Sequence, residues 1–367
     1  MAQHAPFVPN RTNVNLDAIA LNSSRATMLI MYWLELAFAF EDDLLIQDYL
    51  IGFDIGGTKC AVILGKVNGL DVEILDRFAF ATQTPKGPEY ALVHLEESAQ
   101  NLVKSHGLTF DQIRAIGISC GGPLDSKLGT VLGPPNLPGW DCIPITDRFE
   151  AALGVPAKLQ NDANACALAE WKWGAGRGSR NMIFLTFGTG LGAGLILNGE
   201  LYSGASDLAG EVGHVRLADD GPEGYGKRGS FEGFCSGGGI ANLARQVVVE
   251  CWSRGESITF CMNETELSGL SALKIADAAN AGDLVALYIW DTVGKRLGQG
   301  LSMLIDILNP EVIVIGSIFA RQRDLLWPAA KKVIMEEAIP SVANACRIVP
   351  AELGEAIGDY ASLSVAI

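Results

Sequence analysis

Positive charge is scarce in this sequence of 367 residues. Lysine and arginine total 27 against 42 aspartates and glutamates, which gives a formal net charge of −15. Because proteins bind nucleic acid by neutralising its phosphates with a basic surface, this balance argues against a nucleic-acid partner. Charged residues make up 19% of the chain and hydrophobic residues 49%, a composition that excludes a disordered or collagen-like chain.

Paired cysteine motifs and long apolar runs are also missing. None of the eight cysteines belongs to a C-x-x-C pair, so we expect eight buried or half-buried thiols in a reducing, cytoplasmic compartment. The most membrane-like stretch, residues 26–40, is shorter than the ~20 residues of a spanning helix and contains Glu35. We interpret it as a buried or interfacial helix, and we expect no membrane partner.

The length of the chain and its residue pattern predict two domains that follow an N-terminal extension. A chain of 367 residues is long enough for two domains with a full core each. Residues 1–48 are expected to be an acidic N-terminal extension of unknown role, in which residues 1–25 are polar and residues 26–47 form one helix. A winged helix-turn-helix would need more chain and a basic face.

A strand–turn–strand pattern begins at Tyr49 and recurs later. Residues 49–67 predict two strands around a glycine turn, followed by a third strand "DVEILDRFAFAT", a helix "PEYALVHLEESAQNLVKSHG" and a buried strand "IRAIGIS". The segment "NMIFLTFGTGLGAGLILNGELY" repeats the first unit, and helices around 239–249 and 291–308 and a strand "VIVIG" follow. This order differs from the plain alternation of a doubly wound sheet. It predicts two similar α/β lobes with a cleft between them.

The first glycine turn, "DIGGTK", suits the binding of phosphate. Gly56 and Gly57 let the backbone approach an anion, Thr58 adds a hydroxyl donor and Lys59 a positive charge. Asp54 is placed to hold a hydrated Mg²⁺. The segment is neither a Walker motif nor a G-x-G-x-x-G. An ordinary glycine hairpin is the alternative interpretation.

The second glycine turn, "FGTGLGAG", contains Gly188, Thr189 and Gly190. Its G-x-G-x-x-G match is out of register and weak on its own. Two such turns in two lobes carry more weight together, because one can bind the leaving phosphates and the other the transferred group.

The segment "QNDANACALAEWKWGAG" is the strongest candidate for a catalytic element. Asn161, Asp162 and Asn164 cluster before a predicted amphipathic helix, whose apolar face is made up of Ala165, Leu168, Ala169 and Trp171. A helix N-cap is the alternative, but a cap needs only one of the three polar residues. A carboxylate there can accept a proton from a substrate hydroxyl that attacks a phosphoryl group.

A further polar set follows in "GEVGH" and "GSFEGFCSGGG". Glu211 and His214 are three residues apart and face the same side of one helical turn, and Glu232 is another carboxylate near glycines. A structural histidine is the alternative for His214. Carboxylates together with amides suit hydroxyl-rich ligands such as sugars.

With these motifs in hand, the chain from Tyr49 to its C-terminus resembles the ROK family of sugar kinases and repressors. The resemblance rests on seven motifs in one order: "DIGGTK", "GISCGGPLD", "GPPNLPGW", "NDANACALAE", "FGTGLGAG", "GEVGH" and "GEAIGDYASL". It implies the actin-like, hexokinase-type ATPase fold, with two lobes of duplicated βββαβα units around a central cleft. The implied lobes are residues 49–167 plus 354–367 (small) and 168–353 (large). The implied activity is ATP-dependent phosphorylation of a hexose, usually at its 6-hydroxyl.

The resemblance also implies a role for each matching residue. Asp162 would be the general base. The sugar would be bound by Gly121, Gly122, Asn136, Asn161, Glu211, His214 and Glu232. The nucleotide would be bound by Gly56, Gly57, Thr58, Thr189 and Gly190 at its phosphates and by Gly316 near the adenosine. At the position after Gly316 the family more often has a second glycine, where this chain has Ser317.

One departure from the family concerns zinc. Members often carry a motif C-x-C-G-x-x-G-C, which binds zinc together with the histidine of "GEVGH". Here Glu223, Tyr225 and Ser230 stand at the cysteine positions, and tyrosine and serine are poor zinc ligands. We therefore expect ATP and Mg²⁺ as cofactors and no structural zinc, with "GYGKRGSFE" held by packing and hydrogen bonds.

The substrate and the partners stay open at this stage. The segment "NLPGW" resembles glucokinase members, so glucose is the first candidate, and N-acetylmannosamine, N-acetylglucosamine, allose or fructose are alternatives. A sugar-responsive transcriptional regulator or a non-kinase scaffold of the same fold are the other function classes. Retention of Asp162 and the short, acidic start of the chain disfavour the regulator, and the intact acid, amide and histidine positions disfavour the scaffold. A cytoplasmic homodimer is expected.

Overall fold

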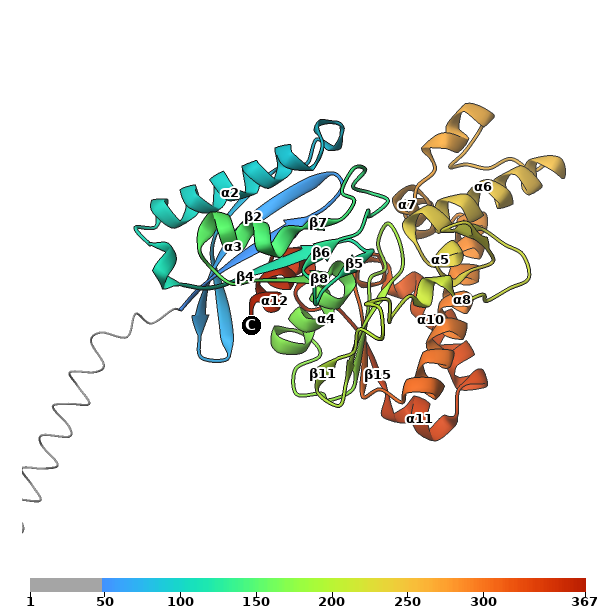
Figure 1. The fold of residues 1–367 in the computed structure, drawn as a ribbon. Helices are drawn as coiled ribbons and strands as arrows, with labels where there is room; N and C mark the ends of the chain where they lie inside the picture. Colours follow the sequence, from blue (N-terminus) through green and yellow to red (C-terminus); the bar gives the residue numbers. More distant parts are fainter. Residues whose placement is uncertain (1–47) are drawn as a thin grey trace, which may run out of the picture. The chain divides into compact units, whose positions relative to one another are not determined.

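The computed structural model describes residues 48–367 (Figure 1). The extension expected over residues 1–48, with its helix at 26–47, therefore lies outside the described residues except for Asp48. Residues 48–367 form one compact unit built on two five-stranded sheets.

The first sheet has the strand order β3-β2-β1-β4-β8. Its strands are β1 (Tyr49–Ile55), β2 (Lys59–Asn68), β3 (Asp71–Ala81), β4 (Ile113–Cys120) and β8 (Ala157–Asn161). β1, β2 and β3 are antiparallel neighbours, whereas β4 and β8 continue parallel to β1. Parallel pairs need a crossover connection, which α2 (Pro88–Ser105) and α3 (Ile145–Leu153) supply.

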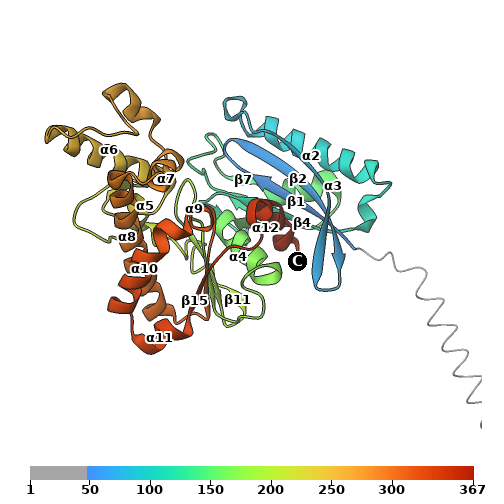
Figure 2. The same cartoon turned by 180° about the vertical axis from the view of Figure 1, so that it is seen from behind.

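Both faces of this sheet are covered. α2 and α3 bury one face, with Phe53 of β1 against Phe149 of α3 at a ring-centroid distance of 4.5 Å. The C-terminal helix α12 (Ile357–Ala366) packs against β1 and β4 on the other face, as Figure 2 shows. A side chain at Gly117 of β4 would come within 2.0 Å of the Ser362 backbone oxygen. Glycine therefore permits this close packing of helix on strand.

The second sheet repeats this topology in the order β11-β10-β9-β14-β15. Its strands are β9 (Met182–Leu185), β10 (Ala193–Leu197), β11 (Glu200–Leu201), β14 (Val312–Ile315) and β15 (Arg347–Pro350). β9, β10 and β11 are antiparallel, and β14 and β15 run parallel to β9. The duplicated unit predicted from the two strand–turn–strand segments is thus confirmed, because both sheets share one strand order and one set of directions.

Helices of the second half bury one face of this sheet in the largest core cluster. They are α6 (Gly237–Ser253), α7 (Ala272–Asn280), α8 (Leu284–Leu308) and α10 (Arg323–Glu337). The helices predicted around 239–249 and 291–308 exist as α6 and α8, and α8 begins earlier because Asp283 caps it by accepting from two backbone amides.

Short elements complete the fold. The helices are α5 (Phe231–Phe234), α9 (Ile318–Arg321) and α11 (Pro340–Ala345), and 3₁₀ turns lie at Thr84–Lys86, Phe110–Gln112, Val212–His214, Glu264–Gly269 and Gly354–Ala356. The remaining strands are β5 (Leu124–Asp125), β6 (Thr130–Val131), β7 (Ile143–Pro144), β12 (Glu223–Gly224) and β13 (Lys227–Arg228).

Helix α4 (Asp162–Trp173) differs from its prediction as an amphipathic helix with one apolar face. Its Ala165 and Ala169 pack toward α12, while Ala167 packs against the second sheet. The helix is therefore buried on two sides, and small side chains allow this: a Cβ at Gly194 would lie 2.4 Å from the Cβ of Ala167. The predicted lobe boundary between residues 167 and 168 falls inside this shared helix, so the partition into lobes stays a prediction.

Two expectations about surfaces can be compared with the structure. All eight cysteines are free, but Cys142 is exposed, so the prediction of eight buried or half-buried thiols is wrong there. The reason is local, because Cys142 lies in a surface turn with a φ of 55°. Among residues 48–367, no helix combines the length and apolarity that crossing a membrane requires.

Candidate active site

The first glycine turn joins β1 to β2. The antiparallel register ends at the pair Ile55–Cys60, and the amide of Gly56 donates to the Lys59 oxygen at 3.0 Å. The amides of Gly57 and Thr58 have no acceptor among residues 48–367. A Cβ at Gly57 would lie 2.4 Å from the Asn136 backbone oxygen, so only glycine fits there. The turn thus keeps two free N–H donors and contacts the "GPPNLPGW" loop.

The second glycine turn joins β9 to β10 and has the same character. Its Gly188 amide donates to the Gly190 oxygen at 3.1 Å, and the amides of Thr189 and Gly190 find no acceptor within the described chain. Free backbone N–H groups in glycine turns are the donors that phosphate oxygens accept from. Both turns therefore fit the phosphates of a nucleotide.

Helix α6 adds a feature that the sequence analysis missed. Its N-terminus meets the second turn, since the Gly237 amide donates to the Gly188 oxygen at 2.8 Å and Ser236 caps the helix. The start of a helix carries partial positive charge and favours anions. The serine followed by three glycines in "CSGGG" is a cap signal that could have indicated this helix start.

Asp162 begins α4 directly after β8. The Ala163 amide is shared by two acceptors, Oδ1 of Asn161 at 2.9 Å and Oδ1 of Asp162 at 2.8 Å. Asn161 is therefore the N-cap of α4, while Oδ2 of Asp162 has no hydrogen-bond partner among the described residues. The Nδ2 group of Asn161 lies 3.2 Å from the position that a Cβ at Gly122 would take. This turn consequently offers one free carboxylate oxygen beside the "GISCGGPLD" loop.

The carboxylates of the candidate site have raised pKa values. Asp162 is open to solvent but closely surrounded by protein, and this partial desolvation raises its pKa, with the Ala163 amide acting in the opposite direction. Burial, together with the Asp359 and Asp162 carboxylates, raises the pKa of Asp54 to about 6, and Lys59 acts in the opposite direction. Asp54 and Asp162 are thus electrostatic neighbours, although β1 and α4 are far apart in the sequence.

Glu211 links the acidic pair to the predicted sugar-binding residues. It precedes the 3₁₀ turn Val212–His214, and desolvation raises its pKa. His214 lowers that pKa, whereas Asp162 and Glu232 raise it. The structure thereby brings His214, Asp162 and Glu232 within electrostatic reach of Glu211, from separate segments of the chain.

Glu232 has a structural contact that the sequence analysis did not foresee. Its Oε2 accepts from the Leu191 amide at 2.9 Å, next to the second glycine turn. A Cβ at Gly190 would lie 2.9 Å from the same oxygen, and one at Gly213 would lie 2.2 Å from the Leu191 oxygen. Glu232 therefore fastens the second turn through Oε2, and its Oε1 accepts no hydrogen bond among residues 48–367.

The remaining predicted residues lie at the edges of this set. Gly316 is buried at the end of β14, where its amide donates to the Leu185 oxygen at 2.9 Å. Ser317 follows with a φ of 48°, and its Oγ lies 3.6 Å from the Cβ position of Gly188. Gly121 has open space around it. Gly316 therefore lies next to the second turn, with Ser317 between them. This place is compatible with the expected contact of Gly316 with the adenosine of a nucleotide whose phosphates lie at that turn.

The loop at the family's zinc position has a donor set that does not suit zinc. Ser230 caps α5 by accepting from the Gly233 amide at 3.1 Å, and the rings of Tyr225 and His214 meet edge-on at 5.4 Å. Lys227 donates to the His214 backbone oxygen at 2.7 Å. No cluster of three metal-ligating side chains occurs within residues 48–367. Packing and hydrogen bonds hold this loop.

The model of the ROK family matches residues 50–362. A glucokinase of Halalkalibacterium halodurans is 30% identical over 84% of this chain and 92% of its own length. A putative xylose repressor of Caldicellulosiruptor sp. is also 30% identical, over 79% of this chain and 70% of its own length.

Among solved structures, a ROK family glucokinase from Streptomyces griseus in complex with glucose and AMPPNP matches with a TM-score of 0.67. It is 30% identical and covers 87% of this chain and 99% of its own. The two-sheet topology described above is therefore that of a family with known structures.

Proposed function

Since the chain belongs to the ROK family, we propose that it transfers the γ-phosphate of ATP to the 6-hydroxyl of a hexose, with glucose as the first candidate. Full-length similarity to glucokinases supports a sugar kinase in general. The choice of glucose, the roles of single residues and the use of Mg²⁺ are the finer parts of the proposal. The homodimer and the cytoplasmic location expected from the sequence stay predictions.

One observation carries the proposal. Asp162 is open to solvent, keeps a free Oδ2, and lies within electrostatic reach of both Asp54 beside the first glycine turn and Glu211 of the sugar-binding set. A base between phosphate-binding turns and hydroxyl-binding groups is the arrangement that phosphoryl transfer to an alcohol requires. A purely structural N-cap would not need the Asp162 carboxylate, because the Asn161 amide oxygen already supplies the cap.

In the proposed reaction, Asp162 removes a proton from the sugar and the glycine turns stabilise the negative charge of the phosphates. Oδ2 of Asp162 accepts the proton of the sugar's 6-hydroxyl while the hydroxyl oxygen forms a bond to the γ-phosphorus of ATP. The bond between the γ-phosphorus and the oxygen that bridges it to the β-phosphate breaks, and ADP leaves. Glu211 and His214 orient the other hydroxyls. The amides of the two glycine turns stabilise the charge on the phosphates. When bound, Mg²⁺ neutralises phosphate charge, and Asp54 would hold its water shell.

A sugar-responsive regulator is the second candidate function, because the family also includes repressors such as the xylose repressor relative. Retention of Asp162 and the net charge of −15 weigh against it. The two functions differ in their response to DNA. A regulator would bind duplex DNA with an affinity that falls steeply with salt, whereas the proposed kinase would not.

The decisive experiment measures ADP release with Mg·ATP across a sugar panel: glucose, mannose, allose, fructose, N-acetylglucosamine and N-acetylmannosamine. Strong release that depends on one hexose supports the kinase and identifies its substrate. Silence across the panel while ATP still binds would reject a kinase for these sugars.

The variant Asp162→Asn tests the base directly. It should keep sugar affinity but lower kcat by roughly 10²–10⁴-fold, because the asparagine cannot accept the proton. Asp147→Asn is a matched control, since Asp147 is an exposed aspartate in the first turn of α3. Normal turnover of Asp162→Asn would contradict the assignment of the base.

A further inference from the structure

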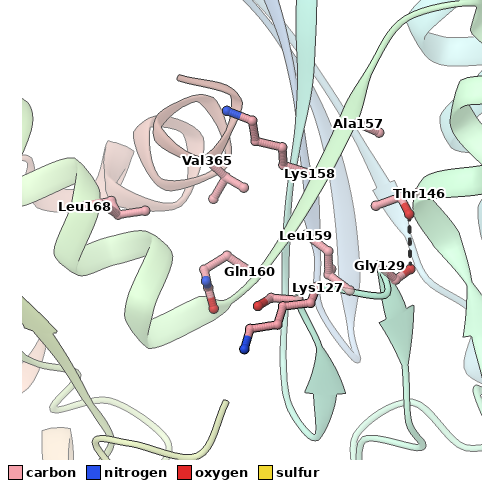
Figure 3. A pocket seen from close by; sticks show the side chains of 10 residues that line it. Lys127, Gly129, Thr146, Ala157, Lys158, Leu159, Gln160, Leu168 and Val365 are labelled. Atoms are coloured by element: carbon pink, nitrogen blue, oxygen red, sulfur yellow. Dashed lines mark hydrogen bonds between the residues drawn. The ribbon is translucent and has the colours of Figure 1, made fainter. Parts of the chain in front are cut away.

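A pocket of about 410 Å³ lies beside β8, outside the set of candidate site residues (Figure 3). Its apolar wall is formed by Leu159 of β8, Leu168 of α4 and Val365 of α12. Its polar side is formed by Lys127, from the turn between β5 and β6, and by Lys158 and Gln160 of β8. Pockets of this size accommodate small organic ligands.

Gln160 is the buried polar group of this pocket, with only 8% of its surface exposed. Its Oε1 accepts from the Asn161 amide at 2.8 Å and from Nδ2 of Asn164 at 3.1 Å. Because a backbone amide can only donate, Oε1 must occupy that place and Nε2 must point elsewhere. Nε2 donates to no group among the described residues. The fully buried side-chain atoms without a partner among residues 48–367 belong to Trp140, Asn164 and Trp290. Nε2 of Gln160 is therefore not sealed off by the protein, and it is free to donate to an acceptor in the pocket.

The charges around the pocket favour an anion. No acidic residue lines it, although the chain as a whole carries a net charge of −15. Lys127 and Gln160 extend to the same side of β8, and Lys158 extends toward α12, where its Nζ lies 3.4 Å from the backbone oxygens of Ala366 and Ile367.

Two neighbouring carboxylates are already engaged by hydrogen bonds. Asp125 accepts from the amides of Lys127 and Leu128 at 3.0 and 2.8 Å. Asp207 accepts from the amide and the hydroxyl of Ser126 at 2.8 and 3.0 Å. These bonds leave the Lys127 ammonium group and Nε2 of Gln160 as donors without a protein partner among residues 48–367. The Lys158 ammonium group, which has three protons, already contacts the Ala366 and Ile367 oxygens and keeps a further proton for a ligand.

We propose that this pocket is a second ligand site, which binds a small organic phosphate. The phosphate accepts hydrogen bonds from Nε2 of Gln160 and from the ammonium groups of Lys127 and Lys158, and the carbon body lies against Leu159, Leu168 and Val365. A phosphate monoester fits because it carries up to two negative charges and its oxygens accept hydrogen bonds. The apolar wall distinguishes such an ester from inorganic phosphate.

Gln160 connects this site to the candidate base. The same side chain that would hold the ligand through Nε2 supports the turn before Asp162 through Oε1. A bound phosphate therefore restrains Gln160, and through it the Asn161 amide, so Gln160 acts as a positioning residue. The proposal does not depend on the kinase function, because binding is measured without turnover.

The test is calorimetric titration of the full chain with glycerol 3-phosphate at constant ionic strength, with glycerol as the neutral counterpart. The ester should bind and glycerol should not. The double variant Lys127→Gln/Lys158→Gln should bind the ester about tenfold more weakly, because it loses two charged donors. Lys331→Gln is the matched control, since Lys331 is exposed on α10 of the second half and should leave the affinity unchanged.

Hydrogen exchange provides a readout that needs no variant. Bound glycerol 3-phosphate should slow exchange of the Asn161 amide, which donates to Gln160. The proposal is overturned if the ester shows no binding at millimolar concentration, or if glycerol binds equally well. It is also overturned if the double variant binds the ester as tightly as the unaltered protein, because the ester then occupies another site such as the glycine turns.

Discussion

Replacing Asp54 by asparagine should make the protein more stable and less active at once. Burial raises the pKa of Asp54 to about 6, from 3.8 in an unfolded chain. A carboxyl group with a raised pKa is held more favourably in its protonated form, so ionisation at neutral pH weakens the fold. An asparagine at this position has no charge to bury. Asp54 makes no side-chain hydrogen bond within residues 48–367, so the substitution removes none.

The magnitude follows from the shift. A displacement of about two pKa units corresponds to about 3 kcal/mol at most. Asp54 is half-buried, and solvent screens part of that effect, so we expect Asp54→Asn to raise the free energy of unfolding by about 1–2 kcal/mol at pH 8. For the unaltered protein, this contribution is fully present below pH 4 and is lost as the pH rises through 6. The advantage of the variant should therefore shrink to about half at pH 5.

Urea unfolding followed by tryptophan fluorescence, at pH 5 and pH 8, measures this difference. Asp219→Asn serves as the control, because Asp219 is an exposed aspartate outside the candidate site. Sugar-dependent ADP release should fall sharply in Asp54→Asn, since the variant lacks the carboxylate proposed to hold the metal's water shell. An equal gain at both pH values, or a loss of stability at pH 8, would refute the electrostatic reasoning.

Three further predictions concern the backbone at Ser317, nucleotide binding at Gly57 and the absence of bound zinc. Ser317→Gly should raise the free energy of unfolding by about 1 kcal/mol, because Ser317 has a φ of 48° that glycine adopts without strain, and urea unfolding should show no such gain for Ser317→Ala. Gly57→Ala should weaken ATP binding by more than tenfold in calorimetry, since its Cβ would lie 2.4 Å from the Asn136 oxygen; unchanged affinity would mean that the first turn does not hold the nucleotide. Metal analysis of the purified protein should find no tightly held zinc, and about one zinc per chain would contradict the donor chemistry around His214.

Local features of the fold could be predicted from the sequence because they depend on neighbouring residues. The alternation and length of apolar segments indicated β1, β2, β3, β4 and α2, and the glycine turns marked where strands reverse. Recurrence of one strand–turn–strand unit indicated the duplication, which the two identical strand orders confirm. The helix α4 was harder, because alanines pack on two sides of it and leave no single apolar face.

The residues of the candidate site could be predicted from the sequence, but the contacts between them could not. Spacing and residue type singled out Asp54, Asp162 and Glu211, since each lies in a motif that is legible over a few residues. Their mutual influence on pKa depends on the packing of separate segments, and no local pattern contains it. The bond from the Leu191 amide to Glu232 is of the same kind.

The sequence by itself determined which residue types stand at the strand ends and turns, and hence the chemistry available to this protein. Only the tertiary structure decided how that chemistry is arranged: Asn136 against Gly57, Asp54 at the start of α12, and the unpartnered Nε2 of Gln160 beside a pocket. The physical reason is range. Turn and strand preferences act over a few residues, whereas burial, electrostatic coupling and the pairing of buried donors depend on segments that meet only when the chain has packed.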